Sequence, residues 1–185
     1  MDLREALERF EPCNEQEQND RRLMLRYLGC FDDLLTRENE LAHFTASAWV
    51  VNRERTKALL AYHNLYASWA WLGGHADGES ELRQVALREV REESGLERLR
   101  PLTDGVFSLE ILGVDAHRRR GRFVSAHLHL NVTYLLEADE RDPVRAKPDE
   151  NRAVRWFPNG EVLTASTEPE MRIVYQKLME KARGL

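Results

Sequence analysis

The sequence predicts an α/β/α sandwich with a mixed sheet, preceded by an N-terminal helical extension. Apolar residues near the N-terminus recur at helical spacing, segments rich in β-formers follow, and two amphipathic helices are placed among and after them. The 185 residues suffice for one domain with a sizeable core and a small appendage. We therefore divide the chain into a helical extension, residues 1–41, and a main domain, residues 42–185.

The extension is expected to contain two helices. The first begins near Leu3 and ends before Pro12, which interrupts the helical pattern. The second is expected over residues 15–35. No Gly/Ser linker follows, so we expect the extension to pack on the main domain. It is expected either to cap the pocket or to form a homodimer interface through Leu23, Tyr27 and Phe31.

The main domain is expected to alternate strands with two helices. The predicted strands and short apolar runs are residues 44–51, 57–63, 69–72, 106–114, 123–136 and 153–157. The first two flank a turn, which indicates a hairpin, and a basic connection, residues 117–122, joins two of the later ones. The predicted helices are residues 80–94, closed by Gly95 as a C-terminal cap, and residues 169–182. This order implies a sheet covered on both faces.

Composition argues against several classes of protein. Hydrophobic residues make up 42% and charged residues 32% of the chain, as in folded globular proteins. A formal net charge of −5 argues against partners such as nucleic-acid polymers and anionic membranes. No signal peptide or membrane span is evident, and the two cysteines, Cys13 and Cys30, form no zinc-finger or disulfide pattern. We expect a cytoplasmic protein with a small-molecule ligand.

The predicted helix at residues 80–94 contains the most informative residues. On a helical wheel, Glu89 and Glu93 fall within its apolar face and Glu92 lies at the edge of that face. Like charges at this spacing repel, and carboxylates turned toward a core lose hydration. A divalent cation compensates both effects, and Mg²⁺ favours carboxylate oxygens and substrate phosphates. The alternative is a solvated glutamate stripe, against which the wheel geometry argues.

This segment resembles the signature of the Nudix hydrolase family, which includes MutT-like proteins. Gly74 is followed at the family's separation by Arg88-Glu89-Val90-Arg91-Glu92-Glu93-Ser94-Gly95-Leu96. The family's α/β/α sandwich also fits most of residues 42–182. Two positions depart from the pattern: Leu72 stands where many members have proline, and Glu79 precedes by one residue the position of the family's loop glutamate.

The resemblance implies a hydrolase that splits a diphosphate bond with water activated by Mg²⁺, or by Mn²⁺ as the alternative. Glu89, Glu93 and Glu92 are expected to hold the metal, with help from the Gly74 carbonyl. Arg88 is expected to orient the glutamates, and Glu79 is assigned to the loop position on the substrate side. The base that takes the proton from water is expected either on the helix, where Glu89 and Glu92 lie, or at Glu150, just before the last strand.

His127 and His129 alternate with apolar residues and so share one face of a predicted strand. Two histidines at this spacing can ligate a metal, pair within the structure or line a pocket. Because Mg²⁺ favours oxygen ligands, we expect these histidines to contact the substrate instead of the metal.

Two other functions are compatible with the same fold. An isomerase of the isopentenyl-diphosphate type needs a cysteine and histidine ligands near the pocket, whereas Cys13 and Cys30 fall in the N-terminal helices. A non-catalytic sensor or scaffold of nucleotide derivatives usually lacks the helix carboxylates, which this chain retains. Hydrolysis of a nucleoside diphosphate derivative or a related compound is therefore the favoured prediction, and the substrate itself is left open.

Overall fold

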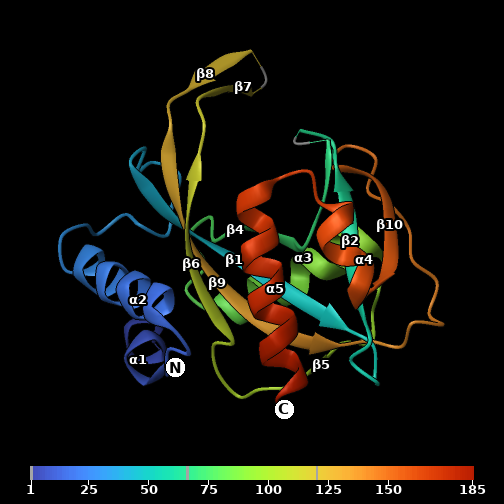
Figure 1. Ribbon diagram of the computed structural model, residues 1–185. Coiled ribbons are helices and arrows are strands. Elements are labelled where there is room, and N and C mark those ends of the chain that lie inside the picture. The colour runs from blue at the N-terminus through green and yellow to red at the C-terminus, as the bar shows by residue number, and fades with distance from the viewer. Residues whose placement is uncertain (1, 66, 120) are drawn as a thin grey trace.

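A mixed β-sheet forms the middle layer of the computed structural model, which describes residues 2–65, 67–119 and 121–185 (Figure 1). Its strands are β1 (Ala42–Val51), β2 (Lys57–His63), β3 (Ser68–Ala70), β4 (Leu72–His75), β5 (Arg100–Pro101), β6 (Ser108–Val114), β9 (His127–Glu137) and β10 (Asn151–Pro158). They are ordered β10-β2-β1-β9-β5, with β3 on β2, β4 on β1 and β6 on β9.

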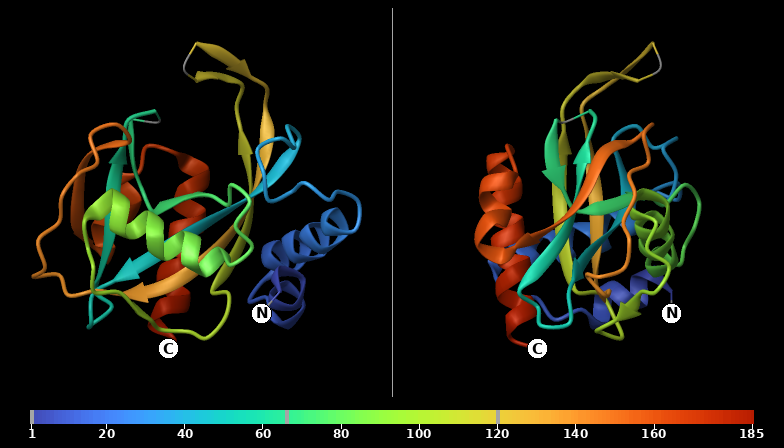
Figure 2. Two further views of the ribbon diagram at one scale, coloured as in Figure 1. Left: turned by 180° about the vertical axis from the view of Figure 1, so that it is seen from behind. Right: turned by 90° about the vertical axis from the view of Figure 1, so that its right-hand side faces the viewer.

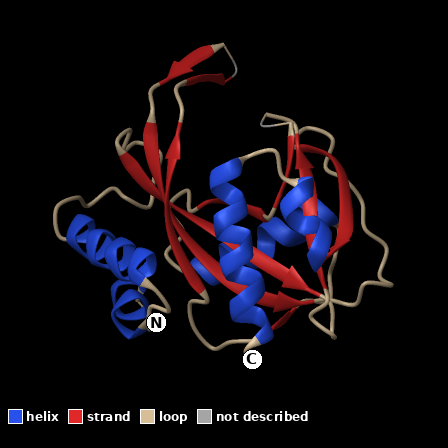
Figure 3. Ribbon diagram, in the orientation of Figure 1, coloured by secondary structure: helices blue, strands red, loops and turns tan. Residues whose placement is uncertain are grey.

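Helices cover both faces of this sheet, which confirms the predicted sandwich (Figures 2 and 3). The five helices of the described residues are α1 (Leu3–Arg9), α2 (Glu15–Leu28), α3 (Leu82–Ser94), α4 (Asn159–Ala165) and α5 (Pro169–Arg183). α3 packs on one face of the sheet and α5 on the other. The short helix α4 was not predicted. None of the helices in the described part of the chain is long and apolar enough to cross a membrane.

The central strand β1 changes partners along its length. It runs parallel to β9 over all its residues, from Ala42 opposite Leu128 to Val51 opposite Glu137. On its other side β1 pairs with β2 only at Val51, opposite Ala58, so the predicted hairpin is paired only next to its turn. Toward the N-terminal end of β1, β4 takes the place of β2 and pairs antiparallel with residues 45–48. This exchange brings the two consecutive glycines of β4 against the middle of the sheet.

All ten residues of β1 are buried because both of its faces are covered. Successive side chains point to opposite faces of a strand. Ala46 and Val50 accordingly join the core beneath α3, whereas Trp49 and Val51 join the core beneath α5. Two hydrophobic clusters thus share one central strand, and they fix α3 and α5 on opposite sides of it.

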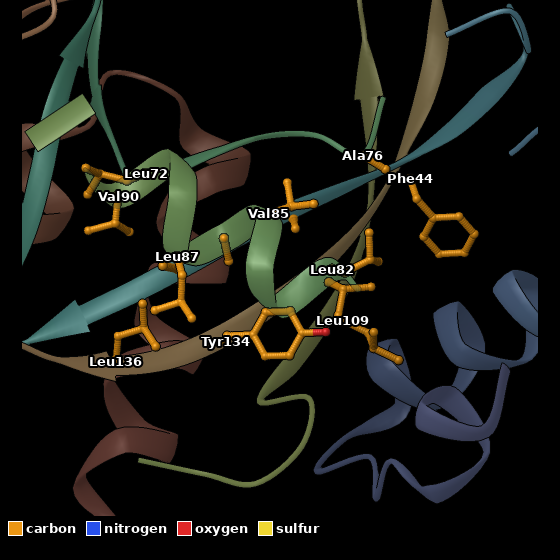
Figure 4. Packing of buried hydrophobic residues seen from close by; sticks show 14 of the residues in the cluster. Phe44, Leu72, Ala76, Leu82, Val85, Leu87, Val90, Leu109, Tyr134 and Leu136 are labelled. Carbon is orange, nitrogen blue, oxygen red and sulfur yellow. The ribbon is translucent and has the colours of Figure 1, made fainter. Parts of the chain in front are cut away.

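The α3 helix is held by the apolar face that the sequence predicts. Leu82, Val85, Ala86 and Val90 are all buried, and Figure 4 shows α3 side chains packed among residues of the strands. The helix begins two positions later than predicted, at Leu82. It ends at Gly95, whose φ of 74° is the left-handed conformation that glycine adopts readily.

The N-terminal extension packs on the main domain, as expected from the missing linker. β6 is an edge strand, and α2 satisfies part of its free backbone: Gln16 Nε2 donates to the Leu109 carbonyl at 2.8 Å, and Asp20 Oδ2 accepts from the Ile111 N–H at 2.9 Å. A covered edge is protected from pairing with other chains. The predicted second helix was too long, because α2 ends at Leu28 with Gly29 as its cap.

A buried ion cluster fastens α2 to α5. Glu17, which is fully buried, lies 2.8 Å from Lys181 Nζ and 3.2 Å from Lys177 Nζ, and it accepts a hydrogen bond from Ser108 Oγ. Lys177 also lies 2.9 Å from Glu110. Burial raises the pKa of Glu17, but hydrogen bonds from the Cys13 N–H, Lys181 and Ser108, together with the charge of Lys177, outweigh it and lower the pKa to about 2. Glu17 is therefore ionised at neutral pH.

The predicted strand at residues 123–136 is divided in two. β7 (His117–Arg119) and β8 (Arg122–Val124) form a separate hairpin that projects beyond the sheet (Figure 1). Residues 125 and 126 then break the pairing before β9 begins at His127. The basic connection is thus the tip of an arm, and Arg120 within it lies outside the described residues.

Candidate metal centre

Three carboxylates from two parts of the chain converge at the C-terminal half of α3. Glu89 and Glu93 lie on α3, and Glu150 lies in the turn before β10. One oxygen from each of the three lies within 4.8 Å of the other two. The structure thus brings the two helix residues together with the loop residue that the sequence singled out as a candidate base.

Two glycines of β4 form the wall behind these carboxylates. The Gly73 N–H donates a hydrogen bond to Glu93 Oε2 at 3.2 Å. A Cβ built on Gly74 would lie 2.5 Å from Glu89 Cδ, and one built on Gly73 would lie 2.5 Å from the Ala46 carbonyl oxygen. A side chain at Gly74 would displace the Glu89 carboxylate, whereas one at Gly73 would meet the backbone of β1. The missing side chain of Gly74 therefore leaves room for Glu89 against the strand.

The described protein groups compensate the negative charge of Glu89 and Glu93 only in part. Glu93 is only 6% exposed, and burial, followed by the neighbouring charge of Glu89, raises its pKa to about 8. The hydrogen bond from Gly73 opposes this rise without cancelling it. Burial and the charge of Glu92 likewise raise the pKa of Glu89. Buried carboxylates at such close range are stabilised in their charged form by a cation.

Lys147 crosses the open side of the centre, and the sequence did not mark it as a site residue. Its Nζ lies 3.0 Å from Glu92 Oε2 and 2.9 Å from Glu150 Oε1. Asn151 secures the same turn, since its Nδ2 donates to the Glu93 carbonyl and its Oδ1 accepts from the Lys147 N–H. The turn at residues 147–151 is therefore docked on the end of α3, and Lys147 sets where the Glu150 carboxylate lies.

Glu92 and Arg88 stand at the rim of the centre. Glu92 is about half exposed and is not one of the three converging carboxylates. Arg88 Nη2 lies 3.5 Å from Glu89 Oε1, and its Nε lies 4.0 Å from Glu92 Oε1. Arg88 is thus placed to pair with the glutamates, as the sequence predicts. A metal role for Glu92 stays a prediction.

The donor set fits a hard divalent cation such as Mg²⁺. Glu89, Glu93 and Glu150 offer carboxylate oxygens, and the backbone of Gly74 lies directly against Glu89. Mg²⁺ is usually held by one or two carboxylates, and it keeps waters and substrate phosphates as its remaining ligands. A bound cation would stabilise the charged forms of Glu89 and Glu93, whose pKa values burial raises.

The structure does not bring Glu79 to this centre. Glu79 lies before the first turn of α3, and its Oε1 accepts a hydrogen bond from the Glu81 N–H at 3.0 Å. At about 1.5 Å per residue, the 13 residues of α3 span roughly 20 Å between this end and the other. A substrate-side role for Glu79 stays a prediction.

His127 and His129 lie in a different cluster, together with His43 and His75. One ring nitrogen from each of His43, His75 and His129 lies within 4.8 Å of the other two, and the ring centroids of His127 and His43 are 4.9 Å apart. The spacing of His127 and His129 predicted their common face. It could not reveal His43 and His75, because they arrive through the pairing of β1 with β9 and with β4.

This histidine cluster lies on the sheet face opposite α3. His75 follows Gly74 directly on β4, and consecutive residues point to opposite faces. Burial, followed by the neighbouring histidines, lowers the pKa of His129 to about 2. Burial also lowers the pKa of His43. Both rings are therefore neutral at physiological pH. The substrate-side role of His127 and His129 stays a prediction.

The cysteines lie in neither cluster. Cys13 precedes α2 and Cys30 follows it, and both are exposed and free. The sequence placed them in the N-terminal helices, whereas the structure places them just outside the two ends of α2.

Comparisons with known proteins agree with this geometry. The family model described as NUDIX domain matches residues 41–178. Among curated proteins, no sequence matches the chain. A C. elegans Ap4A hydrolase in a binary complex is similar in structure, with a TM-score of 0.58 and 18% identity over 77% of this chain and 98% of that one.

Two further solved structures are similar over most of their length. The E. coli dihydroneopterin triphosphate pyrophosphohydrolase has a TM-score of 0.54 and 13% identity, over 72% of this chain and 92% of that one. The NUDIX domain of Shewanella oneidensis NrtR, complexed with ADP-ribose, has a TM-score of 0.54 and 18% identity, over 86% and 96%. At these identities the likeness concerns the fold.

Proposed function

The chain belongs to the NUDIX family of pyrophosphohydrolases, and we propose that it hydrolyses the diphosphate bond of a nucleoside diphosphate derivative or a related compound in a Mg²⁺-dependent reaction. The observation that supports this most directly is the convergence of Glu89, Glu93 and Glu150 against Gly74. A solvated glutamate stripe would expose all of these side chains, whereas Glu93 is buried and accepts a backbone hydrogen bond.

Glu89 and Glu93 are the residues we assign to the metal. Both are anchored on a rigid helix with little freedom to move, since Gly74 lies behind one and the Gly73 N–H holds the other. When bound, Mg²⁺ supplies positive charge that polarises the diphosphate and lowers the pKa of a nearby water, and Mn²⁺ is the alternative ion. Glu92, at the rim, is the candidate for a further ligand.

We assign proton transfer to Glu150. A general base must lie within reach of the attacking water, and Glu150 is next to the carboxylates of α3 without being on that helix. Lys147 Nζ lies 2.9 Å from Glu150 Oε1 and holds this carboxylate in place beside α3. Arg88 fixes the orientation of Glu89 from the opposite side. The alternative base is a helix carboxylate, Glu89 or Glu92.

The substrate class is proposed from chemistry and from the similar structures. Their descriptions name Ap4A, ADP-ribose and dihydroneopterin triphosphate, and each of these compounds contains a phosphoanhydride. The proposed site recognises that linkage through its metal, and the remainder of the substrate is not specified by it. Both exposed cysteines are free, so we place the activity in a reducing compartment such as the cytoplasm.

The test is a hydrolysis screen with Mg²⁺ over a dinucleoside polyphosphate, ADP-ribose, a nucleotide sugar and a pterin triphosphate. Glu93→Gln removes a charge without changing the shape of the side chain and should reduce turnover at least about 100-fold. Glu97→Gln alters an exposed glutamate just beyond α3 and should leave turnover unchanged. Equal turnover in wild type and Glu93→Gln would contradict the proposed centre.

The structure provides one of the two features that the isomerase alternative needs and not the other. It needs histidine ligands and a cysteine near the pocket, and the structure supplies a histidine cluster one residue from Gly74. Cys13 and Cys30, the only cysteines in the sequence, instead flank α2. The sensor or scaffold alternative is disfavoured by the intact carboxylates. Hydrolysis therefore remains the proposal.

A further inference from the structure

Four histidines gather where β1, β4 and β9 meet. His43 on β1 lies directly opposite His129 in the parallel register, and His75 ends β4 beside them. One ring nitrogen each from His43, His75 and His129 falls within 4.8 Å of the others, and no carboxylate belongs to this group. The ring of His127 lies beside that of His43, so four of the six histidines in the sequence are close together.

Backbone carbonyls fix the tautomers of two of these rings. His43 Nδ1 lies 3.0 Å from the Asn39 carbonyl oxygen, and His127 Nδ1 lies 2.8 Å from the Ser125 carbonyl oxygen. A carbonyl oxygen can only accept, so each Nδ1 carries the proton and each Nε2 presents a lone pair. Ligating histidines usually donate their second nitrogen to a carbonyl or carboxylate in this way.

The Nε2 of His43 is left without a hydrogen-bond partner among the described residues, although His43 is only 5% exposed. Its Nδ1 is occupied by Asn39, so Nε2 is the nitrogen that it contributes to the cluster. A buried acceptor with no partner is destabilising and calls for an explanation. A cation among the rings supplies one.

The spacing of a second pair of nitrogens agrees with a tetrahedral ion. His127 Nε2 lies 3.3 Å from His129 Nε2. Two imidazole nitrogens about 2.0–2.1 Å from the same zinc ion, at a tetrahedral angle, are separated by about 3.3 Å. Neutral imidazole is a ligand for zinc and similar transition metals, whereas Mg²⁺ favours oxygen.

We propose that His43, His75 and His129, with His127 as a fourth ligand, form a binding site for a transition-metal cation of the Zn²⁺ type, separate from the carboxylate centre. The two sites lie on opposite faces of β4, because Gly74 backs Glu89 and His75 follows it. A metal on the histidines ties the end of β4 to β1 and β9. It thereby fixes the strand whose glycines position Glu89 and Glu93.

The test uses the full-length protein, stripped of metal by a chelator and titrated with Zn²⁺ in a calorimeter. We expect one Zn²⁺ per chain and a rise in the thermal unfolding temperature on loading. His129→Gln and His75→Gln should each weaken Zn²⁺ binding at least about 100-fold. His75 is only partly buried, so its variant tests the site even where His129→Gln fails to fold. Bound Co²⁺ should show the visible absorption of a tetrahedral site.

Two controls separate this site from its surroundings. His117→Gln alters a histidine whose ring centroid is 6.3 Å from that of His127 and which is outside the ligand set, so Zn²⁺ affinity should be unchanged. Glu93→Gln should retain Zn²⁺ binding while losing Mg²⁺-dependent turnover, which distinguishes this proposal from the proposed function. Zn²⁺ affinity that is absent in wild type, unaffected by His75→Gln, or lost in Glu93→Gln would overturn the proposal.

Discussion

Glu89 fills the space that a side chain on Gly74 would need. A Cβ built on Gly74 would lie 2.5 Å from Glu89 Cδ and 2.7 Å from its Oε1, well inside van der Waals contact. A side chain at Gly74 would therefore displace the carboxylate of the proposed metal ligand.

The first prediction concerns Gly74→Ala. The added methyl group must push the Glu89 carboxylate aside, and a displacement of about 1 Å at a reacting centre can reduce turnover about 100-fold. We expect at least that loss in kcat, measured with the best substrate of the screen. Gly160→Ala is the matched control, because a Cβ at this helical position meets nothing within 4 Å. Similar losses in both variants would show that the effect is not local.

The second prediction concerns the pH dependence of stability in the metal-free protein. The pKa of Glu93 is raised from 4.5 to about 8, so the folded protein keeps a proton that the unfolded chain releases. Its contribution to the free energy of unfolding is fully present below about pH 4.5 and is lost as the pH rises through about 8. Glu93→Gln stays neutral and should be more stable than wild type at about pH 9, by a few kcal/mol.

Urea unfolding in the presence of a chelator, at several pH values between about 5 and 9, measures this difference. The exposed variant Glu97→Gln should follow wild type throughout. A constant difference between wild type and Glu93→Gln across this range would show that Glu93 titrates normally.

The third prediction concerns Lys147→Met. Loss of the ammonium group frees Glu150 and Glu92, which it contacts at 2.9 and 3.0 Å. We expect kcat to fall about 10- to 100-fold because the proposed base is no longer held in place.

Lys57→Met provides the comparison, because Lys57 pairs with Glu140 away from the carboxylate centre. It should leave kcat unchanged. An unaltered kcat in Lys147→Met would contradict the proposal that Lys147 holds the base in place.

The fourth prediction concerns Glu17→Ala. Removing this fully buried carboxylate leaves Lys177 and Lys181 without their shared partner, and breaking a buried ion pair costs about 3–5 kcal/mol. Denaturant unfolding should show a loss of that size. Glu15→Ala, an exposed change in the first turn of the same helix, should cost less than about 1 kcal/mol. Equal losses would mean that the cluster does not anchor α2.

Sequence patterns predicted the parts of this structure that depend on local spacing. Hydrophobic periodicity placed α3 and α5 to within two residues at each end, and the wheel placed Glu89 and Glu93 on the covered face of α3. β2 begins and ends where it was expected, at Lys57 and His63.

Features that depend on pairing across the chain were not predictable in this way. The His43–His129 contact arises from the parallel register of β1 and β9, and no local pattern encodes that register. Lys147 reaches the centre because Asn151 docks its turn on α3. The second helix was extended too far because Leu34, which is buried, follows the apolar pattern of α2 without being helical.

The parallel pairing of β1 with β9 also has a consequence for biosynthesis. The central strand emerges from the ribosome with its partner on the far side still untranslated, because Ala42 pairs with Leu128 and Val51 with Glu137. Non-local pairing of this kind delays folding, since the entropy of closing a long loop must be overcome first. The edge of β1 that faces β9 therefore stays unpaired until most of the chain has been made, whereas β2 and β4 can pair with its other edge earlier. Nascent chains that stop short of β9 are the form most exposed to aggregation.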